Sequence, residues 1–131
     1  MARLIALVFL CLSGLARAQG TSYNAPTTVS GSRVLTTRLW IPDDVDIIRG
    51  AIVQYNSGFD PSLQALARAH GFALIVINNY NGDAIKYGDG DTFLNDLAWH
   101  ANASGHSEIT NLPFVFTGYS IGGQVAEAFN E

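Results

Sequence analysis

The sequence predicts an α/β fold with a mostly parallel sheet and flanking helices. Short apolar runs are typical of strands buried on both faces, and stretches with helical periodicity alternate with them. Proline, glycine and aspartate mark the boundaries between these segments. The resulting order of strands and helices indicates parallel strands joined by right-handed crossovers.

Two strands are predicted early in the chain. Residues 33–41 are rich in β-branched and bulky side chains, and Pro42-Asp43-Asp44 ends the run because proline lacks an amide donor and aspartate favours turns. Residues 50–55 are almost entirely apolar at their centre. We expect the second strand to be buried on both faces.

A helix is predicted after the second strand. Asp60 is a good N-cap acceptor, Pro61 suits the first helical position, and Gly71 is a C-terminal stop. The residues expected to face the core are Leu63, Leu66, Ala67 and Ala69.

Residues 72–77 give the clearest strand, which we expect at the centre of the sheet. A polar connection over residues 80–91 follows, and Asp91 is expected to cap a helix that Gly105 ends. The face predicted to pack contains Phe93, Leu94, Leu97, Ala98 and Ala101. In the connection, Asp83, Asp89 and Asp91 do not have the spacing of an EF-hand, so a solvated turn is the favoured interpretation and no metal site is predicted.

The chain next contains a G-x-S-x-G motif between a predicted buried strand (114–117) and a predicted helix from Ile121 onward. In a strand-to-helix nucleophile elbow, Gly118 and Gly122 let strand and helix pass closely while the Ser120 hydroxyl stands clear of the sheet. The amide of Ile121 then lies at a helix N-terminus, where it can stabilise an oxyanion. Functional residues are expected at the carboxyl ends of the strands.

Several segments together resemble the N-terminal half of secreted bacterial α/β-hydrolases, similar to the feruloyl esterase and polyhydroxybutyrate depolymerase group. They are Leu39-Trp40-Ile41-Pro42, Arg49-Gly50-Ala51-Ile52-Val53, Gln64-Ala65-Leu66-Ala67-Arg68, residues 98–107 and Gly118-Tyr119-Ser120-Ile121-Gly122-Gly123.

The resemblance implies hydrolysis of small-molecule or polymer-attached carboxylic esters through an acyl-serine intermediate, without a cofactor. It makes Ser120 the nucleophile and the Ile121 amide an oxyanion donor. Many relatives carry His-Gly after the first central strand, whereas this chain has Asn56-Ser57 and then Gly58. Because the second donor is a backbone amide, either Ser57 or Gly58 can supply it.

The motif conflicts with the absence of a downstream base. Such folds place the acid and the histidine after the serine. In this sequence the only acidic residues after Ser120 are Glu127 and Glu131, and no histidine follows it. His70, His100 and His106 are interpreted as surface or helix-end residues. We therefore expect residues 19–131 to form a partial α/β-hydrolase domain, truncated after the nucleophile elbow helix, with the missing residues beyond Glu131.

Two alternatives to this ester hydrolase stay open. A secreted, non-catalytic binding or interaction protein on a hydrolase-like scaffold would need no base. Acyl transfer or peptide hydrolysis would use the same serine with a different acceptor or leaving group.

Residues 1–18 are predicted to be a secretory signal peptide. A basic start precedes the apolar run 4–12, and Ala16-Arg17-Ala18 suits signal peptidase. The run is too short for a stable membrane anchor. Without residues 1–18 the chain retains five basic and eleven acidic side chains, which argues against nucleic-acid binding. We expect a secreted or periplasmic protein.

Overall fold

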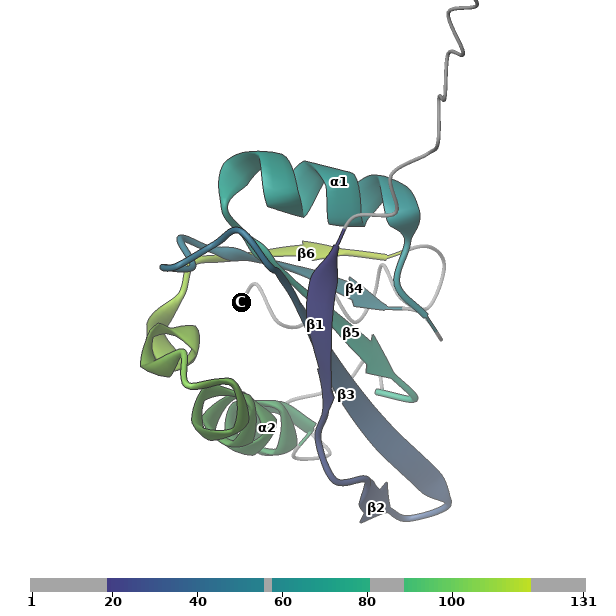
Figure 1. Cartoon of the computed structure of the whole chain (residues 1–131). Coiled ribbons are helices and arrows are strands. Elements are labelled where there is room, and N and C mark those ends of the chain that lie inside the picture. The colour runs from purple at the N-terminus through teal and green to yellow at the C-terminus, as the bar shows by residue number, and fades with distance from the viewer. Residues whose placement is uncertain (1–18, 56–57, 81–88, 119–131) are drawn as a thin grey trace, which may run out of the picture.

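The computed structural model describes residues 19–55, 58–80 and 89–118, and in this part of the chain the helices flank a six-stranded sheet (Figure 1). The strands are β1 (Gly20–Asn24), β2 (Thr28–Ser30), β3 (Arg33–Pro42), β4 (Ala51–Tyr55), β5 (Ala73–Asn78) and β6 (Phe114–Thr117). The helices are α1 (Pro61–His70), α2 (Asp89–Ser104) and the short 3₁₀ helix η1 (Ser107–Asn111).

The sheet is mixed, so the predicted fold class is wrong. Its strand order is β1-β3-β5-β4-β6, with β2 also paired to β3. β3 runs antiparallel to β1, β2 and β5, whereas β4 is parallel to β5 and β6. The described residues form a small α+β domain and not the mostly parallel, α/β-hydrolase-like sheet that was expected.

The connection after β3 explains this difference. Only residues 43–50 join β3 to β4. Parallel strands in one sheet need a crossover of a dozen or more residues, usually a helix, to return to the same edge. The short connection therefore leaves β4 running opposite to β3. The parallel prediction holds only where helices join the strands, from β4 onward.

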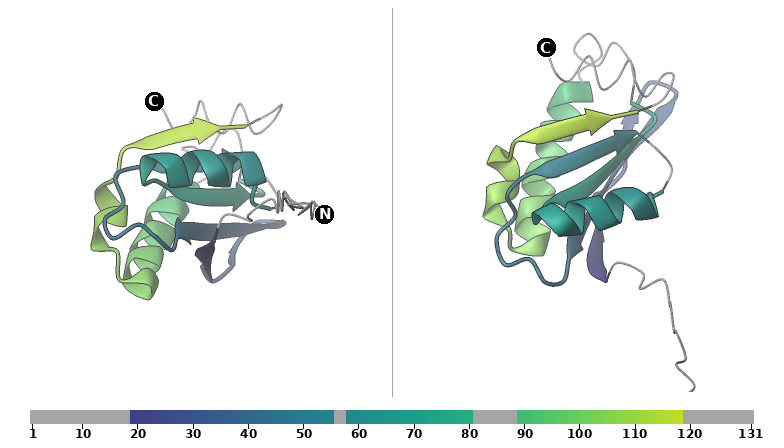
Figure 2. Two further views of the ribbon diagram at one scale, coloured as in Figure 1. Left: turned by 45° about the horizontal axis from the view of Figure 1, so that its top comes forward. Right: turned by 90° about the horizontal axis from the view of Figure 1, so that it is seen from above.

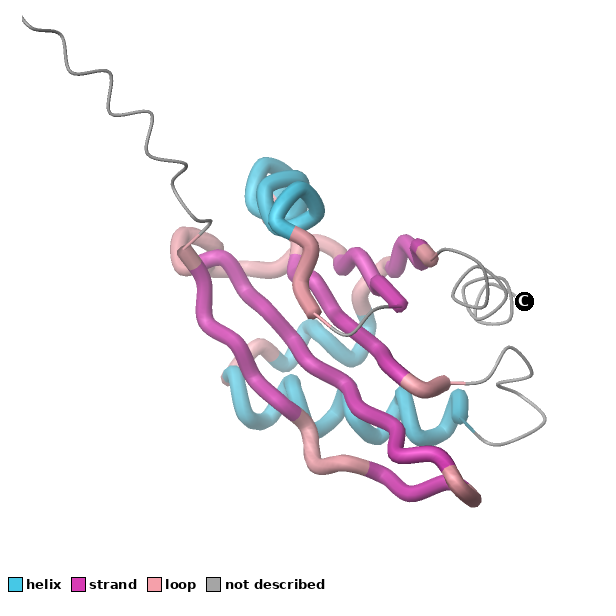
Figure 3. The backbone as a smooth tube through the Cα atoms, turned by 90° about the vertical axis from the view of Figure 1, so that its right-hand side faces the viewer, coloured by secondary structure: helices cyan, strands magenta, loops and turns pink. Residues whose placement is uncertain are grey.

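The sequence pattern did not predict β1, β2 or η1. β1 is a short polar strand at the edge of the sheet, and β2 forms a hairpin with the start of β3 (Figure 3). Gly31 in the hairpin turn has a φ of 61°, a conformation that favours glycine. Such short polar segments lack the apolar alternation that identifies a half-buried strand, and the longer β3 provides their pairing partner.

The parallel part of the sheet agrees with the sequence prediction. β5 is central, flanked by β3 and β4, and residues 73–77 are buried. β6 forms where expected but is only partly buried, with Val115 exposed. The connection through α1 leads from β4 to β5, and the connection through α2 leads from β5 back past β4 to β6. The helices α1 and α2 cover opposite faces of the sheet (Figure 2).

Alternating side chains of the strands form two cores of unequal size. The larger core lies under α2 and η1, and its strand residues are Leu35, Leu39, Ile41, Ala51, Val53, Ala73, Ile75 and Ile77. The smaller core lies under α1 and consists of Trp40, Ile52, Ala67 and Leu74, with Phe59, Leu63 and Phe72 at its margin. Burial of these apolar side chains supplies the main driving force for folding.

The ends of α1 follow the prediction, but its packing face is narrower than expected. Oδ1 of Asp60 accepts hydrogen bonds from the backbone nitrogens of Ser62 and Leu63 at 2.7 and 3.2 Å. Gly71 closes the helix in the left-handed conformation, with a φ of 67°. Leu63 and Ala67 pack on the sheet, whereas Leu66 and Ala69 are exposed, contrary to the expected stripe.

In α2 the predicted packing face is partly wrong. The helix begins at Asp89, two residues before the expected cap Asp91. Phe93, Leu97 and Ala101 are buried as predicted, but Leu94 and Ala98 are exposed. Asp96 and His100 complete the buried face instead. Their spacing with Phe93 and Leu97 is that of one helix face, but polar side chains were not assigned to the core.

Candidate functional site

A hollow of about 450 Å³ lies at the carboxyl ends of β4 and β6. It is lined by Gln54 and Tyr55 of β4, by Asp60, Ser62 and Leu63 at the start of α1, and by Thr117 and Gly118 at the end of β6. The chain leaves β4 toward β5 on one side and later returns to pair β6 on the other side. Open sheets characteristically bind ligands where the strand order reverses in this way.

The hollow coincides with the edge where the sequence places the nucleophile. Gly118, which lines it, is the first residue of the G-x-S-x-G motif. Gly58, one of the two candidates for the second oxyanion donor, lies between β4 and α1. Ser57, Ser120, Ile121 and Gly122 lie outside the described residues, so their roles stay predictions.

Two polar side chains were not recognised as part of this site. Gln54 is the one polar residue in the apolar strand β4, and its side chain is buried, with only 7% of the residue exposed. Its Oε1 accepts a hydrogen bond from the backbone nitrogen of Asp60 at 3.4 Å. The sequence signal that could have identified Gln54 is a single glutamine in an otherwise apolar strand. For Asp60 the sequence predicts only a capping role.

None of the three histidines lines this hollow. His70 lies at the end of α1, at the opposite edge of the sheet, as predicted. His106, next to η1, is partly buried, and its Nδ1 lies 2.9 Å from Oε1 of Glu108. His100 is fully buried in α2, so its interpretation as a surface or helix-end residue is wrong.

The side chain of His100 is removed from water. Burial lowers the pKa of His100 to about 4, and the nearby backbone of Thr37 acts in the opposite direction. Within the part of the chain that the structure describes, neither ring nitrogen has a partner with good hydrogen-bond geometry. A neutral ring removed from the hollow is not placed to serve as its general base.

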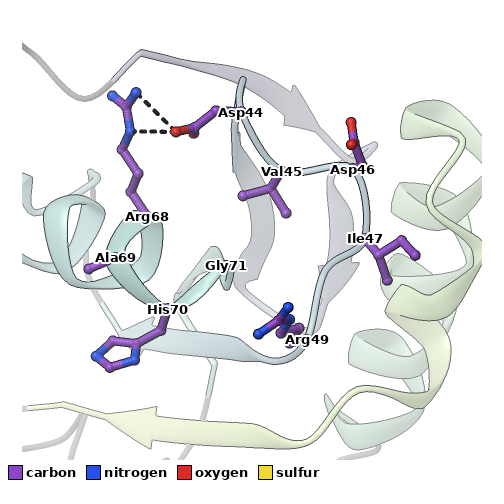
Figure 4. Close-up of a pocket in the computed structure, with 9 residues that line it drawn as sticks. All are labelled: Asp44, Val45, Asp46, Ile47, Arg49, Arg68, Ala69, His70 and Gly71. Carbon is purple, nitrogen blue, oxygen red and sulfur yellow. Dashed lines mark hydrogen bonds and ion pairs between the residues drawn. The ribbon is translucent and has the colours of Figure 1, made fainter.

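A larger hollow, of about 630 Å³, lies at the amino edge of the strands (Figure 4). Arg68 and Asp44 form an exposed ion pair at one side of it, with 3.2 Å between Nη2 and Oδ2, and Arg49 and His70 lie at the other side. Arg68 is in the last turn of α1, where a cation complements the helix dipole, and His70 is the last residue of the helix. The charged side chains at this edge therefore have structural roles that do not require a bound ligand.

Two polar clusters support the carboxyl edge and the larger core. Arg33 of β3 makes a bidentate pair with the buried Asp89 at the start of α2, at 2.6 and 3.0 Å. Asp89 therefore has a structural role, and Asp83, another aspartate of the connection over residues 80–91, lies outside the described residues.

Deeper in the core, Asp96 accepts hydrogen bonds from the hydroxyls of Thr37 at 2.5 Å and Tyr80 at 3.2 Å. Burial raises the pKa of the Asp96 carboxyl, although both hydrogen bonds oppose the change. Burial also raises the pKa of the Tyr80 phenol far above its ordinary value. These three side chains connect β3, the end of β5 and α2, and their burial indicates a structural role.

Residues 19–55, 58–80 and 89–118 contain no helix long and apolar enough to cross a membrane. They also contain no group of three or more His, Cys, Asp or Glu side chains placed to hold a metal ion. Comparisons of the chain with protein-family models and with curated proteins find no match.

Proposed function

We propose that this chain carries the nucleophile and the ligand-binding edge of a secreted serine hydrolase that cleaves carboxylic esters, as in the α/β-hydrolase families that its sequence resembles. One observation carries the proposal: the hollow at the carboxyl ends of β4 and β6 reaches Gly118, where the G-x-S-x-G motif begins. A ligand in this hollow would therefore contact Gly118, which precedes Ser120 by two residues.

In the proposed reaction, Ser120 Oγ attacks the carbonyl carbon of the ester and loses its proton to a general base. The bond to the alcohol oxygen breaks, the alcohol leaves with a proton, and water then releases the acid from the acyl-serine. The amides of Ile121 and of Ser57 or Gly58 would hold the oxyanion. Because the described histidines lie away from the hollow, the base has to come from outside the described residues.

The same placement of the histidines favours a second candidate, a non-catalytic binding protein. A serine without a base is a weak nucleophile at neutral pH. In that case the hollow would bind a ligand without turning it over. Acyl transfer or peptide hydrolysis would share the serine and differ in the acceptor or leaving group.

Covalent labelling separates these possibilities. We expect a fluorophosphonate probe to label the product of the full reading frame and expect Ser120→Ala to reduce labelling to background, measured by mass spectrometry of the modified peptide. Ser62→Ala is the matched control because Ser62 lines the same hollow and should leave labelling intact. A folded protein that is not labelled would favour the binding protein, and a modified residue other than Ser120 would contradict the proposed nucleophile.

A further inference from the structure

Asp60 contributes a negative charge to the hollow at the carboxyl ends of β4 and β6. Among the described residues that line it, Asp60 is the one with a charged side chain. A helix N-terminus normally attracts anions through its free N–H groups and its dipole. Here Oδ1 of Asp60 already accepts from the backbone nitrogens of Ser62 and Leu63. An anionic ligand would therefore meet a carboxylate at this helix end.

Gln54 offers the opposite kind of group, a hydrogen-bond donor. Its Oε1 faces the backbone nitrogen of Asp60, which leaves the two N–H groups of Nε2 for other partners. Gln54 lines the hollow although only 7% of the residue is exposed. A side-chain amide donor at the hollow can bind an oxygen atom of a ligand.

We propose that Gln54 and Asp60 determine the ligand class of this hollow. It binds an uncharged group that carries an acceptor oxygen, such as a carbonyl or hydroxyl, and it rejects carboxylates. This inference rests on the proposed function only where it takes the uncharged ligand to be an ester. Selection by charge follows from the lining residues and is testable without turnover.

A substitution at residue 60 can isolate the charge. Asn is about as good an N-cap as Asp, so Asp60→Asn keeps an acceptor for the amides of Ser62 and Leu63 while it removes the carboxylate. Hexanamide and hexanoate are suitable probes because they are similar in size and differ in charge. ¹H–¹⁵N NMR titration of the full chain reports binding at the side-chain amide of Gln54 and at the backbone amides of Leu63 and Gly118.

In the unmodified chain we expect hexanamide to bind roughly 3- to 10-fold more tightly than hexanoate, as for like charges close together in a partly solvated site. Asp60→Asn should bring the ratio of the two affinities close to one, and raised ionic strength should reduce it in the unmodified chain. Gln54→Met, which removes the donor, should weaken hexanamide binding.

The matched control is Asp44→Asn, which removes a carboxylate from the hollow at the amino edge and should leave both affinities unchanged. An affinity ratio that Asp60→Asn does not change would overturn the proposal. So would probe-induced shifts at Arg49 and His70 without shifts at Gln54. Failure of the Ser120 labelling together with intact probe selectivity would refute the hydrolase and leave this assignment standing.

Discussion

Arg33→Ala is expected to lower the free energy of unfolding by about 3 kcal/mol, at the lower end of the 3–5 kcal/mol typical for breaking a buried ion pair. The side chain of Asp89 is only 1% exposed, whereas that of Arg33 is 25% exposed. Without the guanidinium, the Asp89 carboxylate would stay buried and lose both charged donors. Urea denaturation at pH 7 measures the change.

The exposed ion pair between Arg68 and Asp44 provides the control. Their side chains are 38% and 56% exposed, so Arg68→Ala should cost less than about 1 kcal/mol. Arg33→Lys should recover only part of the loss, because lysine cannot make the bidentate contact with Asp89 and also reach the carbonyl oxygen of Asn79. Equal costs for Arg33→Ala and Arg68→Ala would contradict the role assigned to the buried pair.

Local signals in the sequence predicted most individual elements but not how they assemble. The Asp60 cap, the Gly71 stop and the apolar run of β5 depend on neighbours within a few residues, so the sequence pattern was enough to predict them. The direction of β3 depends instead on the length of the connection over residues 43–50. The prediction of a parallel sheet used only the alternation of strands and helices, which takes no account of the length of that connection.

The buried face of α2 shows a second limit of the sequence pattern. Apolar periodicity favoured Leu94 and Ala98, yet the structure buries Asp96 and His100. Asp96 is tolerated in the core because two hydroxyl groups from other elements, on Thr37 and Tyr80, bond to it. Partners so distant in sequence cannot be assigned from helical periodicity.

At the candidate site, the sequence predicted functional residues at the sheet edge where the hollow lies, but it did not predict all of the residues that line the hollow. The hollow lies at the carboxyl ends of two predicted strands and includes Gly118. The sequence did not predict a role for the Gln54 side chain, because that role depends on the positions of β6 and of the start of α1 next to it in the fold. The chemistry predicted for Ser120 and Ile121 still depends on the motif.

His100 should make the protein less stable in mild acid. Its pKa is about 4 in the folded state, against 6.5 when exposed. Between these values the unfolded chain binds more protons than the folded chain, so this stabilising contribution is complete above about pH 6.5 and is lost as the pH falls toward 4. The corresponding loss is about 3 kcal/mol, since each pKa unit is worth roughly 1.4 kcal/mol.

The carboxyl groups of Asp96 and Glu108 also change the stability of the protein in acid. The raised pKa of Asp96 acts in the opposite direction, because it gives stability that is lost as the pH rises through the folded-state value. The lowered pKa of Glu108, caused first by the hydrogen bond from the backbone of Ile48, gives stability that is lost as the pH falls through its folded-state value. A pH profile of the unmodified chain alone would therefore combine all three groups.

Comparison with His100→Leu separates the histidine from these carboxyl groups. Leucine has a similar volume and removes the titratable ring, whose nitrogens have no hydrogen-bond partner among the described residues. The variant should therefore gain stability relative to the unmodified chain as the pH falls from 7 to 4. Leu97→Met, on the same buried face of α2, should change stability by the same amount at every pH because it carries no titratable group. If the difference between the unmodified chain and His100→Leu is constant in urea titrations from pH 7 to 4, His100 does not cause the acid sensitivity.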